Sequence, residues 1–291
     1  MKFSTFKVLI FLYMLTAGKP LQYNAIQELV IPRDVPISNY FAFLDSIIEK
    51  QNRNTDYELN EHVLVRANSW IIDTLMQTDY YLQLKKGSFI DNQSKMIILR
   101  AGQKLLIPDS QMTANILNRF KSTWIDINIP EFKLRIYRDS LLLFTLPVRV
   151  GENASKYLAM NDRITDLRTI HGDGSIVGYE KSPTFFNPQS GERFFFTKRD
   201  DGRITLMPQI PWIITEINGI RNGQLIHPTT NPITLGKAYS NGCIGTGEGD
   251  AWKIYYYAPI GTKIRIRYDL NVKDSIGKQQ VLKDIYNYTG F

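Results

Sequence analysis

The stretch Trp124–Gly151, WIDINIPEFKLRIYRDSLLLFTLPVRVG, decides the fold of this chain. In residues 124–128 and again in 132–137, apolar side chains alternate with polar or aromatic ones. A period of two is the pattern of a strand that buries one face. Arg138-Asp139-Ser140 then makes a turn, and residues 141–150 run back. The stretch therefore predicts a β-hairpin at the start of a β-rich domain.

Short segments of the same type continue toward the C-terminus, separated by Gly, Pro and Asn. Many short strands at this spacing indicate a β-sandwich or a barrel. We expect one helix at 251–257 (AWKIYYY), and a polar extension at 269–291 with a helix near 279–286. We therefore place a mainly β domain at 122–268. Its further strands are expected at Arg193–Thr197, Ile204–Met207, Trp212–Glu216, Gln224–His227 and Lys263–Tyr268.

Residues 19–121 show a mixed pattern and predict a smaller α+β region. Four apolar side chains, at 41, 44, 47 and 48, share the face of a helix that Ser38-Asn39 could cap. HVLVR at 62–66 is typical of a short strand, and Asn68-Ser69 could cap a second helix from Trp70 to Met76. Residues 96–100 (MIILR) are expected to be extended.

The first 18 residues have the composition of a secretory signal peptide. Lys2 and Lys7 precede an apolar run of ten residues, 8–17, and small residues follow it. The run is short for a membrane span, and the rest of the chain has no other long apolar segment. We expect export to the periplasm or cell envelope, with no stable membrane span after cleavage.

Composition narrows the function. The net charge is +7, but Lys and Arg are spread along the chain without a block, so nucleic-acid binding is not expected. One cysteine, Cys243, excludes an intramolecular disulfide and a multi-cysteine zinc site. Exported proteins usually pair or avoid thiols, so a lone cysteine in such a chain suggests a working thiol or an intermolecular bridge.

The sequence around Cys243 favours a nucleophile. Ser240-Asn241-Gly242-Cys243 is a turn of small residues that could expose the sulfur, and its backbone N–H groups could face an oxyanion. His227 ends a predicted strand sixteen residues upstream. A histidine beside a thiol can take its proton near neutral pH. The alternative is a buried structural thiol beside an unrelated histidine.

This arrangement resembles the YkuD-type L,D-transpeptidase catalytic domain. That family carries a histidine, then about 14–17 residues, then Ser/Thr-His-Gly-Cys, an apolar residue and usually Arg or Asn. The resemblance covers about 122–268, including the opening hairpin, Pro211-Trp212 and Asp250-Ala251-Trp252. The chain departs from the pattern twice, with Asn241 in place of the motif histidine and Gly245 in place of Arg or Asn.

The resemblance implies a YkuD-type β-sandwich and a mechanism. Cys243 would attack the third residue of a peptidoglycan stem tetrapeptide, and His227 would serve as general base and then acid. Ser240 would orient the turn or His227, and the backbone of Gly242 and Cys243 would donate to the oxyanion. An acceptor amine from a second stem would complete a 3→3 cross-link, with no metal or organic cofactor required.

Two other functions remain open at this point. If water replaces the amine, the same residues make an L,D-carboxypeptidase. If Asn241 and Gly245 reflect a decayed site, the protein is a non-catalytic cell-wall-binding protein. A second, looser resemblance, to a LysM carbohydrate-binding module, covers 62–108 and implies that the N-terminal region binds glycan strands.

Other residues carry weaker signals. Asn241, Trp212 and Thr229 are candidates for substrate binding, and Asn231 could also line the cleft. His171 is expected in an exposed turn. We expect Asp250 and Glu248 to be a helix cap and a solvated charge, and the tyrosines at 255–257 to lie in and around the core.

Overall fold

The computed structural model describes residues 27–160, 162–274 and 276–289. The predicted signal peptide at 1–18 lies outside these residues. Within the described part of the chain, no helix combines the length and apolar character needed to cross a bilayer.

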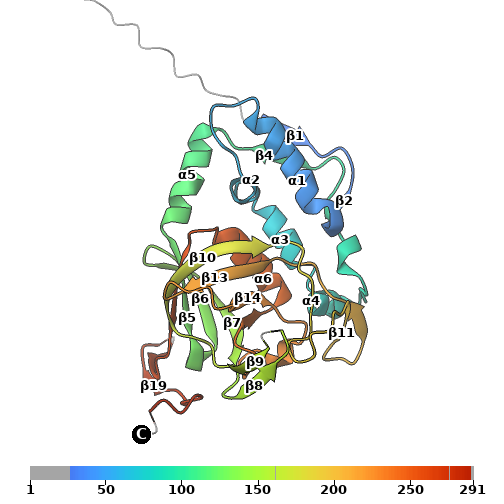
Figure 1. The fold of residues 1–291 in the computed structure, drawn as a ribbon. Coiled ribbons are helices and arrows are strands. Elements are labelled where there is room, and N and C mark those ends of the chain that lie inside the picture. Colours follow the sequence, from blue (N-terminus) through green and yellow to red (C-terminus); the bar gives the residue numbers. More distant parts are fainter. Residues whose placement is uncertain (1–26, 161, 275, 290–291) are drawn as a thin grey trace, which may run out of the picture.

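The C-terminal half is built on one nine-stranded sheet (Figure 1). The strands follow the order β15-β7-β16-β14-β13-β10-β17-β5-β6, and β6 also pairs with β7, so the sheet closes like a barrel. The strands are β5 (Thr123–Asn128), β6 (Lys133–Arg138), β7 (Leu141–Gly151), β10 (Gly172–Glu180), β13 (Trp212–Ile217), β14 (Leu225–Pro228), β15 (Ala238–Ser240), β16 (Ile244–Thr246) and β17 (Lys263–Arg267). The mainly β class is confirmed.

The hairpin predicted at the start of the domain is β6–β7, with β5 on its other side. The alternating apolar residues of β5 and β6, among them Ile125 and Ile136, are fully buried in the barrel core. Sheet closure follows because both edges of this three-stranded unit find partners: β5 pairs with β17 and β7 with β16. In the closed sheet, β14 and β16 are parallel neighbours, so His227 in β14 and the turn before β16 lie close together.

Three short hairpins of the C-terminal half lie outside the large sheet. One lies near the strands predicted at 193–197 and 204–207, and another includes residues where the sequence predicts a helix near 279–286. The expected strand at 193–197 is found as β11, shifted to Phe196–Lys198. The small pairs are β8 (Ser155–Leu158) with β9 (Arg163–Asp166), β11 with β12 (Ile204–Leu206), and β18 (Asn271–Lys273) with β19 (Gln279–Val281).

The N-terminal region is helical with two small β-pairs, as the mixed pattern predicts, and it lies against one end of the barrel (Figure 1). The helices are α1 (Ile37–Asn52), α2 (Glu61–Ala67), α3 (Trp70–Met76), α4 (Tyr80–Lys85) and α5 (Ser110–Lys121), with a 3₁₀ turn η1 (Gln93–Lys95). The strands are β1 (Gln27–Val30), β2 (Val35–Pro36), β3 (Ile97–Leu99) and β4 (Lys104–Ile107).

The strand predicted at 62–66 is wrong, because these residues lie in helix α2. The Asn60 side chain accepts a hydrogen bond from the Val63 N–H at 2.9 Å and caps this helix. A five-residue apolar run cannot distinguish a strand from a buried helix, and here the cap decides. The LysM-like resemblance expected a strand at this position, so that part of it fails; glycan binding by the region stays a prediction.

Two predicted helix caps are also wrong, although both helices exist. Pro36 rather than Ser38-Asn39 precedes α1, and Ser69 makes no capping bond to α3. Asn68 instead donates to the Leu64 and Leu106 carbonyls and accepts from the Leu106 N–H, so it joins α2 to β4.

Helix α6 (Glu248–Tyr257), predicted at 251–257, belongs to two hydrophobic cores. Trp252, Tyr255 and Tyr256 are fully buried in a core with the N-terminal helices, whereas Ile254 packs in the barrel core. The predicted core position of the tyrosines is thus confirmed. The two halves of the chain are joined through α6 by continuous packing.

The helix predicted near 279–286 is wrong. Strands β18 and β19 pair there, and Tyr286 turns inward to join the barrel core at 2% exposure. No local pattern signals this burial, since Tyr286 is held by hydrogen bonds to residues more than 100 positions earlier.

Candidate active site

Cys243 and His227 are brought together by two neighbouring parallel strands. Ile226 in β14 pairs with Ile244 in β16, so His227 lies beside Gly245, and Cys243 directly precedes β16. Because side chains two residues apart on a strand share a face, Cys243 lies on the same face as Gly245 and His227. The upstream histidine strand and the cysteine turn of the sequence prediction therefore meet at one edge.

Both residues line a cavity of about 490 Å³. That volume lies in the range of small-molecule and peptide-binding clefts. The part of its lining that comes from residues 184–208 is mostly apolar and includes Phe185, Phe194 and Met207. Half-buried Cys243 can therefore meet a ligand that the cavity shields from bulk water.

His227 is held in a defined orientation. Its Nδ1 is 2.9 Å from the carbonyl oxygen of Pro228, and its ring centroid is 5.3 Å from that of Trp212. Nδ1 can approach a carbonyl at this distance only as a donor, so the neutral ring carries its proton there. Nε2 is then the unprotonated nitrogen, which is the form a general base requires.

The cysteine turn is fixed from both ends. Gly242 has φ +107°, a conformation that disfavours side chains, and its carbonyl accepts from Thr169 Oγ1 at 2.9 Å. Ser240 Oγ donates to the carbonyl of Cys243 at 2.5 Å. Ser240 thus orients the turn, whereas Pro228 orients His227; the sequence left these alternatives open.

Burial shifts the pKa values of His227 and Cys243 in opposite directions, and each shift favours the neutral form of its group. Burial, then the nearby Arg149 cation, lowers the pKa of His227 to about 4, against a smaller opposing effect of the Pro228 carbonyl. Burial raises the pKa of the Cys243 thiol, opposed by the Leu225 N–H and by Arg149. At neutral pH the resting pair is therefore neutral thiol and neutral imidazole.

The predicted substrate-binding residues all reach the cavity. Trp212, Thr229, Asn231 and Asn241 line it. Thr229 is buried and accepts from the Asn231 N–H at 3.2 Å, which stabilises the loop after β14. Asn241 is half-buried, and its side chain makes no hydrogen bond with any residue of the described ranges. His171 is exposed in a loop, as expected, and does not line the cavity.

Arg149 was missed by the sequence analysis. It lies in β7 opposite Gly245 and lines the cavity. A Cβ on Gly245 would approach the Arg149 Nε to 2.5 Å and its Cγ to 2.6 Å. Glycine at 245, where the resemblance expects Arg or Asn, therefore leaves room for the arginine of the neighbouring strand. Val148 and Val150 are buried in the barrel core, so the alternation in PVRVG places Arg149 on the opposite face of β7. That alternation is the sequence signal that could have pointed to it.

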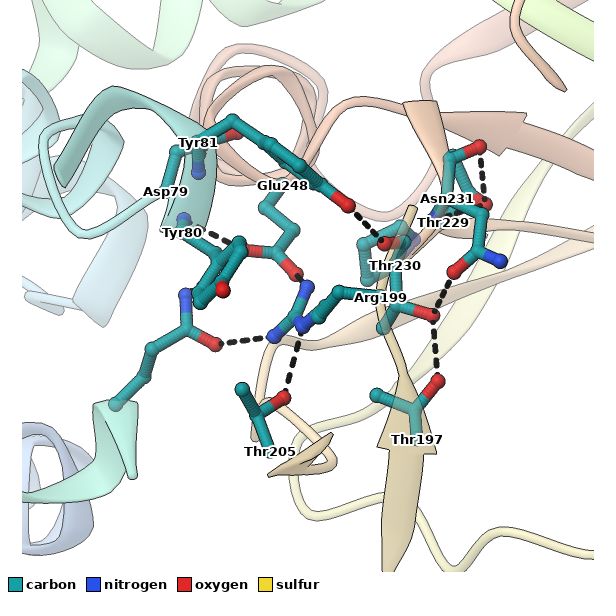
Figure 2. Close-up of polar contacts among 12 residues, drawn as sticks. Asp79, Tyr80, Tyr81, Thr197, Arg199, Thr205, Thr229, Thr230, Asn231 and Glu248 are labelled. Atoms are coloured by element: carbon teal, nitrogen blue, oxygen red, sulfur yellow. Dashed lines mark hydrogen bonds and ion pairs between the residues drawn. The ribbon is translucent and has the colours of Figure 1, made fainter. Parts of the chain in front are cut away.

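Glu248 was expected to be solvated, and this is wrong. It is 2% exposed and forms an ion pair with fully buried Arg199 (Figure 2). Arg199 Nε also donates to Thr205 at 2.8 Å, and Gln93 bridges the pair by donating to Glu248 and accepting from Arg199. The partner lies 49 residues upstream, so no local pattern reports the pairing.

This buried pair ties the cavity wall to the N-terminal region. The Tyr80 N–H donates to Glu248 at 3.0 Å, and Tyr81 Oη donates to the Thr230 carbonyl at 3.3 Å (Figure 2). Thr230 in turn exchanges a 3.0 Å hydrogen bond with Thr197 on β11, and both line the cavity. Helix α4 therefore buttresses one side of the site.

A metal centre is not indicated. Across residues 27–160, 162–274 and 276–289, no three His, Cys, Asp or Glu side chains gather as potential ligands. The reactive groups that line the cavity are the Cys243 thiol, the His227 imidazole and the Arg149 guanidinium.

Comparison with known proteins identifies the domain. A profile described as the L,D-transpeptidase catalytic domain (YkuD) matches residues 122–266. No curated protein matches the chain significantly.

Solved structures similar to this chain include L,D-transpeptidases from several bacteria. One from Mycobacterium smegmatis is 14% identical with a TM-score of 0.35, and the match covers 50% of this chain and 58% of that one. One from Xylanimonas cellulosilytica is 12% identical with a TM-score of 0.37 and coverage of 70% and 92%. The catalytic domain of the E. faecium enzyme is 16% identical with a TM-score of 0.33 and coverage of 50% and 96%.

This chain thus spans little more than half the length of the Mycobacterium smegmatis protein. From the match over residues 122–266, the chain carries an L,D-transpeptidase catalytic domain of the YkuD family.

Proposed function

We propose that this protein is an exported peptidoglycan L,D-transpeptidase that forms 3→3 cross-links through a Cys243 acyl-enzyme. The observation that carries the proposal is the placement of Cys243 and His227 on one face of adjacent parallel strands, lining one cavity. Within a YkuD domain, this pair supplies both the nucleophile and the base that acyl transfer needs.

In the first half-reaction, the Cys243 sulfur attacks the carbonyl of the third residue of a stem tetrapeptide. His227 Nε2 takes the thiol proton as the bond forms, and Nδ1 keeps its hydrogen bond to Pro228. The imidazolium then protonates the departing D-alanine amine, which leaves a thioester on Cys243. Since both groups rest neutral, charge separates only during attack.

The oxyanion faces the cysteine turn. The Gly242 carbonyl points at Thr169, and in a trans peptide the next N–H points the opposite way. The Cys243 N–H is thereby directed away from Thr169, and with the Gly242 N–H it is our candidate donor to the tetrahedral intermediate.

In the second half-reaction, the amine of a second stem attacks the thioester. His227 takes the amine proton, the carbon–sulfur bond breaks, and the thiol is restored. In this proposal the protein meets its substrate in the cell envelope, after export, and the N-terminal region contacts the glycan strands there.

The test is incubation of the full chain with disaccharide-tetrapeptide, read by mass spectrometry. A 3→3 dimer supports the proposal, and loss of D-alanine without dimer would replace it with an L,D-carboxypeptidase. If Cys243→Ala and wild type behave alike, with neither product formed, the protein is not an enzyme on this substrate. A carbapenem, whose strained lactam acylates thiolates, should add its mass to wild type and not to Cys243→Ala.

A further inference from the structure

Arg149 holds a charge that the fold does not neutralise. Among the residues described, it forms no ion pair with a carboxylate, and its one hydrogen bond is a 3.3 Å contact from Nη1 to Thr234. Its Nε is buried without any partner. Buried Arg199, by contrast, meets Glu248, Thr205 and Gln93. Arg149 as a whole is half-buried, and an unpaired cation withdrawn in part from water is costly unless a ligand compensates it.

The guanidinium lies where the substrate must bind. Arg149, Gly245 and His227 occupy one row across β7, β16 and β14, since Gly245 pairs with both of the others. The arginine stem crosses β16 in the space above Gly245. The cation therefore lies in the same row as the base, and the nucleophile Cys243 is two residues before Gly245, the central residue of that row.

The cavity offers nothing else with a full charge. Of the described residues that line it, Arg149 is the one Lys or Arg, and none is Asp or Glu. The remaining lining is aromatic, aliphatic, hydroxyl, amide and imidazole. A single cation in a neutral, half-enclosed cavity selects for an anion, and a guanidinium matches a carboxylate with two parallel hydrogen bonds.

We propose, building on the function proposed above, that Arg149 is a specificity residue that binds a carboxylate of the acyl donor beside the scissile bond. A stem tetrapeptide offers two such groups, the terminal D-alanine carboxylate and the side-chain carboxylate of a diaminopimelyl third residue. Both present the same chemistry to Arg149, and the experiment separates them.

The experiment measures equilibrium binding to full-length Cys243→Ala by titration calorimetry, so that it does not depend on turnover. The probes are a diaminopimelyl stem tetrapeptide and two analogues, one amidated at the terminal carboxyl and the other at the side-chain carboxyl. One amide should bind about 10- to 100-fold more weakly than the parent peptide, as expected for loss of a charge-assisted pair. The weakened analogue identifies the carboxylate.

The Arg149→Gln change, made in the Cys243→Ala background, should weaken the parent peptide by a similar factor and abolish discrimination against the amide. Arg149→Lys keeps the charge without the fork and should retain part of the discrimination. Arg163→Gln removes an exposed arginine on β9 outside the cavity and is the matched control. Melting temperatures confirm that each variant folds.

If the parent and both amides bind Cys243→Ala equally, or if none binds at 1 mM, Arg149 does not read a carboxylate and the inference is wrong. Discrimination that survives in a folded Arg149→Gln, or that is lost in a folded Arg163→Gln, would overturn it as well. If the parent binds with Arg149-dependent discrimination but wild type makes neither dimer nor free D-alanine, the transpeptidase proposal fails and the carboxylate site stands.

Alkylation separates this role from thiolate stabilisation. Iodoacetamide is neutral and small, so its rate at Cys243 reports the thiol alone. Arg149→Gln should alter that rate far less than it alters peptide binding. A comparable loss of alkylation rate would mean that Arg149 also acts on the sulfur, an effect that cannot contribute to peptide binding by Cys243→Ala.

Discussion

Thr169 Oγ1 donates a 2.9 Å hydrogen bond to the carbonyl of Gly242, and so fixes the peptide unit that precedes the nucleophile. The same oxygen accepts from the Gly151 N–H at 2.8 Å. Tyr286 completes the arrangement by donating to the Gly151 carbonyl at 2.8 Å and accepting from the Thr169 N–H at 3.0 Å. A residue outside the matched span 122–266 thus supports the cysteine turn.

Replacing Tyr286 with Phe should destabilise the fold and slow acyl transfer. The ring still fills its place, but two buried backbone groups lose their partner, which costs about 1–3 kcal/mol. Urea denaturation measures the loss, and kcat should fall with little change in KM because Gly242 is less well held. Tyr288→Phe, at a 40% exposed tyrosine, is the control. Equal effects of the two changes would refute the role given to Tyr286.

The pH dependence should reflect a neutral catalytic pair. The His227 imidazole has a pKa of about 4, so kcat/KM should hold from pH 7 down to about pH 5 and then drop as the base becomes protonated. Since burial raises the pKa of Cys243, iodoacetamide alkylation should keep accelerating with pH beyond the ordinary thiol value of 9.0. An acid limb near 6.5, or alkylation that levels off at pH 7, would instead indicate a thiolate–imidazolium pair.

Breaking the Arg199–Glu248 pair from one side should be severe. Glu248→Gln leaves the Arg199 charge buried, and uncompensated buried charges cost about 3–5 kcal/mol. The double change Arg199→Met/Glu248→Leu should be less destabilising than Arg199→Met alone or Glu248→Leu alone. Denaturant midpoints measure the three variants. Arg53→Gln, which breaks an exposed pair with Glu49, should alter the midpoint little. Additive single and double effects would argue against coupling.

Gly245→Ala should act through Arg149. The added methyl overlaps the arginine stem, which must move off β16. In the Cys243→Ala background, we expect weaker binding of the parent tetrapeptide and reduced discrimination against the amide. With Arg149 already changed to Ala, Gly245→Ala should have no further effect on binding. A further loss in that background would show that the glycine serves the backbone instead.

The parts of the fold that sequence could predict are those whose pattern is local. The hairpin of β6 and β7 shows in strict alternation, and Ser240-x-Gly242-Cys243 with His227 shows in motif spacing. The helix at 61–67 was mistaken for a strand because its apolar run is too short to show a helical period. The sequence signal for the helix was the cap residue Asn60. β10 was missed since its three glycines, at 172, 174 and 178, resemble a loop.

The site residues that escaped prediction depend on distant partners. Glu248 looks like a solvated helix-start acid until Arg199 is placed against it. Arg149 belongs to no motif, and its role follows only from the neighbouring strand's glycine. Tyr286 ends the helix predicted from the sequence near 279–286, yet its ring packs in the barrel core.

Because α6 has Ile254 in one core and Trp252 in the other, the N-terminal region cannot swing independently of the cavity. Any wall component gripped by residues 27–121 would be held at a constant distance and angle from Cys243. The fixed distance between the bound wall component and Cys243 would then determine which stem peptides along a glycan strand can reach the nucleophile.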